Sequence, residues 1–398
     1  MKALVFKAIG DIELQDVADP AIQDAQDVIV RLTRSAICGT DLHFIRGTVP
    51  GVAKNTILGH EEVGIVEEIG KEVKTVKPGD RVIIPSTIGC GHCSYCKQEI
   101  YAQCDNANPH GPQAGTAFFG GPQSTGPFNG MQAEKVRVPY ADAMLLKIPK
   151  NVTDDQAILL SDILPTAYMA VEMANIHTND TIAVFGCGPV GQLVIACLKK
   201  IGIKKIFAVD HIPSRLQMAR DQGSYVINFD EVDPVKKLQE LTNGQGPDRI
   251  IDAVGIDAQK SNRLADIFNT KEFKEELDKI VPHPQPDNGN WVPGNGPSQA
   301  LQWAVKAIAK AGTISIIGVY PQELTSFAIG AAMNKNVTIR MGNCNHRKYL
   351  PMLLEWIEKG EFNIEHFITQ KVPFKEIIAA YKHFDAREDN WIKVVLLM

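Results

Sequence analysis

The sequence predicts an α/β protein with two domains, one built on a doubly wound parallel sheet and one on a β-rich barrel. Its 398 residues are too many for a single compact core. Residues 1–165 contain short strands separated by turn signals, whereas residues 166–342 alternate continuous apolar runs with helix-like segments. Residues 343–398 return to mixed α/β patterning and are expected to rejoin the first domain.

Hydrophobic periodicity defines the individual elements. In the first domain Val28, Val30 and Leu32 alternate, and EEVGIVEEIG and DRVIIP are predicted strands. In the second domain we expect strands in IAVFG, IFAVD, RIIDAVG and TISIIGV, with NVTIRM closing the sheet near residue 341. The segments VGQLVIACLKKIG and PSRLQMARDQG are predicted helices between the first of these strands.

An irregular insertion interrupts the second domain at about residues 257–299. It contains a charged helical piece, KEFKEELDKI, followed by a run rich in Pro, Asn and Gly. Long segments of this kind are usually functional lids or linkers. Because it leaves the sheet at the end of a strand, where dinucleotides bind, we hypothesise that it caps the adenosine half of a cofactor. A surface decoration is an equally compatible alternative.

Composition excludes several classes of function. The net charge is −5, with 44% hydrophobic and 22% charged residues, which favours neither nucleic acid nor an anionic membrane as a partner. The start, MKALVFKAIGDIEL, has too short an apolar run for a secretory signal, so a cytoplasmic protein is expected. Residues 181–198 lack charge, but their glycines and proline favour a buried strand, turn and helix over a membrane span.

The segment GCGPVG has the form of a dinucleotide fingerprint, because it follows a predicted strand and opens a predicted helix. Its residues are Gly186, Gly188, Pro189, Val190 and Gly191. Asp210 ends the next strand about 20 residues later, where a carboxylate can hold both ribose hydroxyls and repel a 2′-phosphate. NAD is therefore favoured over NADP, although Arg215 nearby weakens that preference.

Four cysteines lie within fifteen residues: Cys90, Cys93, Cys96 and Cys104. Four thiolates at this spacing can surround a tetrahedral structural Zn²⁺. The first three also match the start of a ferredoxin-type run, but the seven-residue gap before the fourth does not, and unmetallated cysteines are a further alternative. A second, weaker pattern is Cys38 with His60, each at the end of a predicted strand. These two residues are half of a zinc site, but such a pair is more often part of the buried core without a metal.

With these motifs together, the chain resembles the medium-chain zinc-dependent alcohol dehydrogenases, and among them the glutathione-independent formaldehyde dehydrogenases. The resemblance spans the chain except the insertion and rests on CGTDLH, GHEEVGIVEEIG, PGDRV, the four cysteines, GMQAEKVRVPYAD, LSDILPTAY and the glycine fingerprint. It implies a GroES-like catalytic domain at 1–165 and 343–398, with a structural zinc lobe at about 88–106. It also implies a Rossmann NAD-binding domain at 166–342.

The resemblance also implies a catalytic zinc site. Cys38 and His60 match the first two ligands, and Asp162 matches the third, where many relatives have Cys or Glu; read alone, Asp162 is a helix cap. Glu61 matches a carboxylate beside the metal that acts as a support or an occasional ligand, and is otherwise a surface charge.

A proton relay is the next implication. Thr40 and His43 match it, although read alone they are a turn threonine and a surface histidine. Thr166 matches a residue that abuts the nicotinamide. The loop from Asn108 to Gly130, which carries Phe118, Phe119 and Phe128, is expected to shape the substrate pocket.

The implied activity is zinc-dependent hydride transfer between NAD and a small alcohol or hydrated aldehyde, with formaldehyde the sharpest expectation and two zinc ions per chain. Alternatives are a broad-range alcohol dehydrogenase, an aldehyde dismutase that retains NAD, and a non-catalytic nucleotide-binding protein. A zinc-free quinone reductase is disfavoured because it needs none of the candidate ligands. The resemblance suggests a homo-oligomer, either a tetramer or a dimer.

Overall fold

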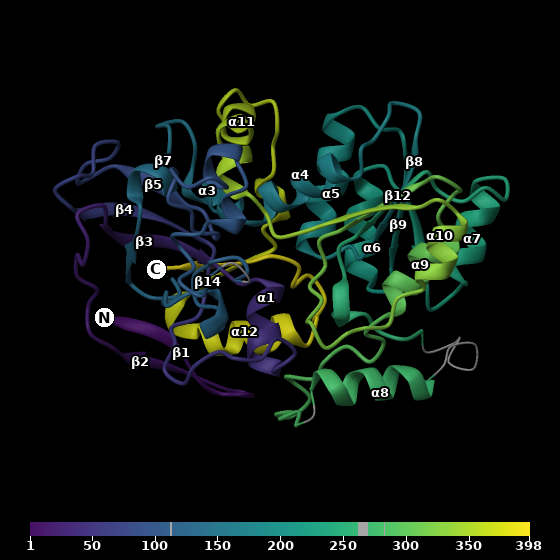
Figure 1. The fold of residues 1–398 in the computed structure, drawn as a ribbon, viewed down its shortest axis with the longest axis horizontal. Coiled ribbons are helices and arrows are strands. Elements are labelled where there is room, and N and C mark those ends of the chain that lie inside the picture. The colour runs from purple at the N-terminus through teal and green to yellow at the C-terminus, as the bar shows by residue number, and fades with distance from the viewer. Residues whose placement is uncertain (112–113, 262–269, 282) are drawn as a thin grey trace. The chain divides into compact units, whose positions relative to one another are not determined.

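The computed structural model describes residues 1–111, 114–261, 270–281 and 283–398 (Figure 1). They form two compact units. Unit 1 comprises Met1–Pro165, Gln285–Trp291 and Asn343–Met398, and unit 2 comprises Thr166–Pro284 and Val292–Gly342. Part of the predicted insertion (262–269 and 282) and part of the predicted pocket loop (112–113) lie outside the described residues.

Unit 1 is built on a seven-stranded sheet with the order β14-β15-β3-β4-β5-β7, in which β6 also pairs with β3. Its strands are β3 (Val28–Ala36), β4 (Glu62–Ile69), β5 (Arg81–Ile84), β6 (Lys135–Val138), β7 (Leu146–Lys147), β14 (Gln370–Pro373) and β15 (Val394–Leu397). A separate hairpin joins β1 (Lys2–Ala8) and β2 (Asp11–Asp16). The predicted strands around Val28 and in the two quoted segments are confirmed, and Val28, Val30 and Leu32 all point into the core.

The helices of unit 1 lie between or after its strands in the sequence. They are α1 (Gly39–Arg46), α2 (Ala141–Met144), α3 (Asp154–Ser161), α11 (His346–Glu358) and α12 (Ile377–Asp385), while α4 (Ile163–Met173) runs from unit 1 into unit 2. Because β15 pairs with β3, the C-terminal segment belongs to the same sheet as the N-terminal strands.

Unit 2 contains a six-stranded parallel sheet with the order β10-β9-β8-β11-β12-β13. Its strands are β8 (Thr181–Phe185), β9 (Lys205–Asp210), β10 (Tyr225–Asn228), β11 (Arg249–Asp252), β12 (Thr313–Ile316) and β13 (Thr338–Met341). This order is that of a Rossmann sheet, and β8 and β11 flank the point where the order reverses. Five strands were predicted. The sixth, β10, was not, because its four residues are partly polar and only Ile227 is fully buried.

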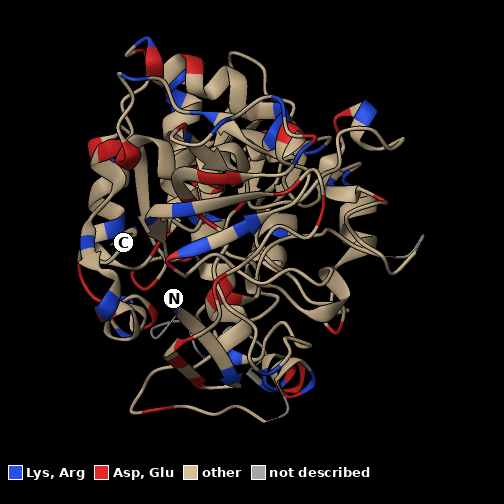
Figure 2. Ribbon diagram, turned by 90° about the vertical axis from the view of Figure 1, so that its left-hand side faces the viewer, with Lys and Arg blue, Asp and Glu red and all other residues tan. Residues whose placement is uncertain are grey.

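The helices of unit 2 follow its strands: α5 (Pro189–Lys200), α6 (Pro213–Asp221), α7 (Pro234–Leu241), α8 (Thr270–Ile280), α9 (Gln299–Ala307) and α10 (Ile329–Asn334). The uncharged run at 181–198 is β8, a glycine turn and most of α5, as predicted. Among the described residues no helix is long and apolar enough to cross a membrane. Lys and Arg alternate with Asp and Glu over the elements in view in Figure 2, in keeping with the small net charge.

Part of the insertion packs into unit 1. Trp291 is 2% exposed, and its backbone N–H donates to Asp385 Oδ2 at 2.7 Å. Asp385 also accepts from the buried Arg46 at 2.6 Å, and Asn290 donates to the carbonyl of Lys382 at 2.8 Å. A surface decoration would not bury a tryptophan, so this segment is a structural component of unit 1.

Candidate metal centres and dinucleotide turn

Three segments distant in sequence bring Cys38, His60 and Asp162 together in unit 1. Cys38 follows β3 and is the N-cap of α1, and His60 lies two residues before β4. Asp162 separates α3 from α4, and its φ of −146° and ψ of −67° interrupt the helical path there. The antiparallel pairing of β3 with β4 places the first two residues side by side.

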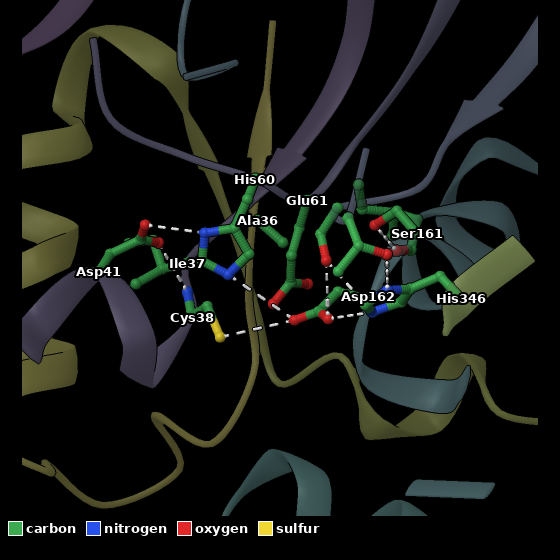
Figure 3. A network of polar contacts seen from close by, with 12 residues as sticks. Ala36, Ile37, Cys38, Asp41, His60, Glu61, Ser161, Asp162 and His346 are labelled. Atoms are coloured by element: carbon green, nitrogen blue, oxygen red, sulfur yellow. Dashed lines mark hydrogen bonds and ion pairs between the residues drawn. The ribbon is translucent and has the colours of Figure 1, made fainter. Parts of the chain in front are cut away.

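The ligand atoms of Cys38, His60, Glu61 and Asp162 all lie within 4.8 Å of one another (Figure 3). Asp162 Oδ2 is 3.7 Å from Cys38 Sγ and 3.7 Å from His60 Nε2. Around a tetrahedral zinc with bonds of about 2.0–2.3 Å, neighbouring ligand atoms are separated by about 3.3–3.8 Å. The separations between the sulfur of Cys38, the nitrogen of His60 and the oxygen of Asp162 therefore fit a zinc ion.

The ring of His60 is oriented by Asp41. Asp41 Oδ1 lies 3.1 Å from His60 Nδ1, while Asp41 Oδ2 accepts from the backbone N–H of Cys38 at 3.2 Å. One carboxylate thus links the start of α1 to the imidazole and leaves Nε2 directed at Asp162. Asp41 was not among the residues predicted, although its place three residues after Cys38 is a common helix-capping position.

Glu61 is fully buried. Its Oε2 pairs with Lys393 Nζ at 2.5 Å, whereas Oε1 forms no hydrogen bond with any described residue. Burial raises the pKa of Glu61 although Lys393 opposes it. The predicted alternative of a surface charge is therefore wrong. Lys393 was not predicted, because it lies 332 residues from Glu61 in the sequence.

The second oxygen of Asp162 faces a different set of donors. Oδ1 accepts from His346 Nε2 at 2.6 Å and from Ser86 Oγ at 3.1 Å. Burial disfavours ionisation of Asp162, but the hydrogen bond and charge of His346 outweigh it and lower the pKa of this carboxyl. Burial also disfavours the charged form of His346 and so lowers its pKa. Cys344 and Asp162 outweigh this effect and raise the pKa of His346 to about 10. No sequence signal had indicated His346.

The two residues matched to a proton relay both lie on α1. Thr40 is half-buried in its first turn, and His43 is buried, so the alternative of a surface histidine is wrong. The Thr48 hydroxyl donates to the carbonyl of His43 at 3.2 Å, and the same hydroxyl lies 2.8 Å from His43 Nδ1, so Thr48 holds this edge of the ring.

Of the three phenylalanines in the predicted pocket loop, Phe118 lies nearest the site. Its ring meets that of His60 edge-on at 6.3 Å between centroids and stacks on Phe44 at 5.9 Å. Phe119 is instead buried in the hydrophobic core, where it contacts Phe128. The loop thus places one aromatic ring beside a candidate ligand.

The four-cysteine lobe is a second candidate metal centre. The sulfurs of Cys90, Cys93, Cys96 and Cys104 lie within 4.8 Å of one another. The Cys93 and Cys104 sulfurs are 3.9 Å apart, close to the edge of about 3.8 Å expected for four Zn–S bonds of about 2.3 Å.

Backbone N–H groups surround these sulfurs. Cys104 Sγ accepts from the N–H of Cys90 at 3.2 Å and from that of Ala107 at 3.4 Å. Burial opposes ionisation of Cys93, but N–H donors from Cys96 and Asp105 lower the pKa of this thiol to about 6. Burial instead raises the pKa of Cys96 and Cys104, so Cys93 is the thiol of this lobe that these donors favour as a thiolate, the form in which cysteine binds metal.

The glycine fingerprint has the geometry that its sequence predicts. Gly186 has φ +86°, which only glycine adopts readily, and a Cβ at Gly191 would collide with the carbonyl oxygen of Gly186. Gly188 is the N-cap of α5, with Pro189 and Val190 in its first turn. A Cβ added to Gly188 would lie 3.7 Å from Arg215 Nη1, so this guanidinium stands beside the turn.

Asp210 ends β9 next to that turn. Its carboxylate accepts from the backbone N–H of Cys187 at 2.7 Å, of His211 at 2.7 Å and of Ile212 at 3.0 Å. A carboxylate can accept about four hydrogen bonds, so these three hold it in place with capacity remaining. Thr166 lies in α4 of unit 2, one helical turn after Asp162.

Comparisons with known proteins agree with this arrangement. Residues 24–150 match the alcohol dehydrogenase GroES-like domain, and residues 189–283 match the zinc-binding dehydrogenase domain. The zinc-type alcohol dehydrogenase-like protein AdhB of Bacillus subtilis is 36% identical over the whole of both chains. Alcohol dehydrogenase TADH from Thermus sp. ATN1 superimposes with a TM-score of 0.80 at 30% identity, covering 100% of this chain and 99% of that one.

A glutathione-independent formaldehyde dehydrogenase of Pseudomonas aeruginosa is 36% identical, but over 65% of this chain and 66% of its own. This formaldehyde dehydrogenase is thus similar to the chain over part of its length, whereas AdhB and TADH match it throughout. The combination of a GroES-like domain, a Rossmann domain and full-length similarity establishes that the chain belongs to the zinc-type alcohol dehydrogenase family, whose members are oxidoreductases.

Proposed function

We propose that the protein is an NAD-linked, zinc-dependent dehydrogenase that oxidises a small alcohol or hydrated aldehyde, with formaldehyde hydrate as the best candidate. The observation that carries the proposal is the convergence of Cys38, His60 and Asp162, with ligand atoms within 4.8 Å. An aldehyde hydrate would lose a hydride from carbon to NAD⁺ and a proton from its hydroxyl, giving the carboxylic acid, NADH and H⁺.

In this proposal Cys38, His60 and Asp162 hold the catalytic zinc, and the four-cysteine lobe holds a structural one. A zinc ion with one open position supplies Lewis-acid chemistry, which lowers the pKa of a bound hydroxyl. The protein's part is orientation. Asp41 directs His60, and Glu61, held by Lys393, adds a buried carboxylate beside the other ligands.

Thr40 and His43 serve as the proton path. Thr40 lies two residues from Cys38 on the same helix, so its hydroxyl is suited to take the proton released from the substrate. Thr48 holds Nδ1 of His43 at 2.8 Å, and in the proposed path Nε2 is the atom that accepts and passes on the proton.

NAD is the proposed cofactor. Asp210 accepts from three backbone N–H donors at the end of β9, where it can also accept from ribose hydroxyls and would repel a 2′-phosphate. Arg215 stands beside Gly188 and is better placed for the pyrophosphate at that turn. Thr166 is assigned to the nicotinamide end on the resemblance alone.

A second candidate is a broad-range alcohol dehydrogenase, favoured by the full-length similarity to alcohol dehydrogenases. The test is to compare kcat/KM for formaldehyde, ethanol, isopropanol and a polyol with NAD and with NADP, and to measure zinc per chain. We expect two zinc ions per chain and the highest kcat/KM with formaldehyde and NAD. Asp162→Ala should lose activity and one of the two zinc ions. Asp155→Ala, which alters a carboxylate of the preceding helix, is the control and keeps both.

Each other result decides between alternatives. A higher kcat/KM for isopropanol would select the broad-range enzyme. Equal formation of formate and methanol without net NADH would select a dismutase. No turnover with one zinc per chain would leave a non-catalytic nucleotide-binding protein. Lower KM for NADP than for NAD would overturn the role given to Asp210.

We further propose that the protein forms a homo-oligomer in the cytoplasm. The apolar side chains of Ile329, Met333 and Met341 are 71%, 79% and 65% exposed on α10 and β13, the edge strand of the sheet. Exposed apolar groups beside an open strand edge favour pairing with a second copy. All eight cysteines are free, in keeping with a reducing compartment.

A further inference from the structure

The geometry points to His346 as a positioning residue that presents one oxygen of Asp162 to the metal. This inference rests on the proposed role of Asp162 as a zinc ligand. The two oxygens of its carboxylate have separate surroundings (Figure 3). Oδ1 accepts from His346 Nε2 at 2.6 Å and Ser86 Oγ at 3.1 Å, while Oδ2 lies 3.7 Å from both Cys38 Sγ and His60 Nε2.

The imidazole of His346 is itself held at its other nitrogen. The Thr87 hydroxyl donates to the carbonyl oxygen of Cys344 at 3.1 Å. Its oxygen is thereby left to accept from His346 Nδ1, which lies 2.9 Å away. With a hydrogen bond at each nitrogen and 2% exposure, the ring has one orientation, and Nε2 points at Asp162 Oδ1.

The carboxylate of Asp162 needs hydrogen-bond donors that fix which of its oxygens faces the metal site. An aspartate with both oxygens available can bind a metal through either oxygen or through both, and each mode gives a different coordination geometry. Two donors on Oδ1 prevent its use as a ligand and restrict rotation of the carboxylate, so Oδ2 binds alone and a tetrahedral position stays open for substrate. Hydrogen-bond partners of this kind usually change metal affinity by about 10–100-fold.

The position of His346 in the chain supports this role. It is the first residue of α11 and lies 184 residues after Asp162, whereas Ser86 and Thr87 follow β5. The carboxylate is therefore held by two segments that contribute no metal ligand of their own. A purely structural role would instead tie α11 to α3, and the experiment separates the two.

The test compares His346→Leu, which removes both donors, with His346→Gln, which keeps one side-chain N–H. Zinc is measured after equilibration with a graded series of chelator concentrations, and the d–d absorption bands are recorded after replacement by Co²⁺. We expect His346→Leu to weaken binding of one of the two ions about 10–100-fold and to change the cobalt bands, with the lobe metal unaffected. His346→Gln should restore most of both.

Ser161→Ala is the matched control, because this buried hydroxyl next to Asp162 bonds to the carbonyl of Ile158 and not to the carboxylate. It should keep both ions and the wild-type bands. The metal-free His346→Leu protein should melt below metal-free wild type, because the buried carboxyl of Asp162 loses its partner, so the melting temperature alone does not show positioning. If His346→Leu does not fold, Ser86→Ala takes its place and should show a smaller shift of the same kind.

Unchanged affinity and cobalt bands in a folded His346→Leu protein would overturn the positioning role. So would a lower melting temperature of the metal-free protein with no change in affinity. Failure of the proposed function has a different signature: Asp162→Ala itself would keep two zinc ions of wild-type affinity, whatever His346→Leu does.

Discussion

At the scale of single residues, we predict that Phe118 sets the selectivity for a small substrate. Its ring packs edge-on against His60 and stacks on Phe44, so it fills space beside a proposed zinc ligand. Phe118→Ala would remove most of that bulk without touching a ligand atom. Hydrophobic pockets discriminate single methylene groups by about 10–200-fold, so the effect on selectivity should be of that order.

We predict that Phe118→Ala raises kcat/KM for butanol relative to that for methanol or formaldehyde by at least roughly tenfold. Initial rates with each substrate, in protein shown to retain zinc, provide the measurement. Phe119→Ala is the control: this ring is buried in the core, so it should lower the melting temperature and leave the substrate ratio unchanged. An unchanged ratio in Phe118→Ala would remove the ring from the pocket.

At the scale of elements, we predict that the order of the four-cysteine lobe depends on a bound metal ion. Several of its N–H groups donate to cysteine sulfur, and its regular structure is limited to the short 3₁₀ turns Cys96–Gln98 and Tyr101–Gln103. Structural zinc sites of this kind contribute directly to folding free energy.

Cys104→Ser is expected to release one zinc per chain, lower the melting temperature and expose the lobe to proteolysis between residues 90 and 110. Metal analysis, calorimetry and mapped limited digestion test this. Cys197→Ser offers a comparison, since this cysteine is buried in α5 and belongs to neither cluster, so the variant should keep both ions. Retention of two zinc ions by Cys104→Ser would contradict a four-sulfur site.

Part of the insertion contacts the last residue of α1 and the end of α12 through Asp385. Its segment from Gln285 to Trp291 joins unit 1, where Arg46 and Asp385 form a buried ion pair and Asp385 also receives the N–H of Trp291. Arg46 is the last residue of α1, the helix that carries Thr40 and His43. The insertion therefore supports the far end of the helix that begins at Cys38. Its proposed role as an adenosine cap stays a prediction.

At the scale of the whole molecule, the exposed apolar side chains on α10 and β13 predict self-association. The double variant Ile329→Glu/Met333→Glu should place like charges in the interface and dissociate the oligomer, because desolvating unpaired carboxylates is costly. Sedimentation should show a species of half the wild-type mass or less.

Ile201→Glu is the control for this variant. Ile201 is 43% exposed after α5 and is not part of that face, so the change should leave the mass unchanged. If the wild type sediments as a monomer, or if the double variant keeps the wild-type mass, α10 is not an interface.

Patterns within short sequence segments were enough to predict the glycine turn, the four-cysteine cluster and most of the Rossmann strands. The turn at GCGPVG could be predicted from six residues alone. The left-handed φ of Gly186 and the close approach of Gly191 to the Gly186 carbonyl both arise within this segment. Cys90, Cys93, Cys96 and Cys104 likewise lie near one another in the chain, so their convergence involves little loop closure. Continuous apolar runs predicted five of the six Rossmann strands.

The sequence by itself thus predicted the two fold classes, because the spacing of apolar residues distinguishes their elements. It also determined the glycine turn and the four-cysteine cluster, since both depend on contacts within short segments. Tertiary structure alone decided which distant side chains meet. Cys38, His60 and Asp162 were matched by resemblance, but nothing in their spacing requires them to converge. Lys393 at Glu61 and His346 at Asp162 were not predicted at all. Their contacts span 332 and 184 residues, and only the pairing of strands and the packing of helices brings such side chains within hydrogen-bonding distance.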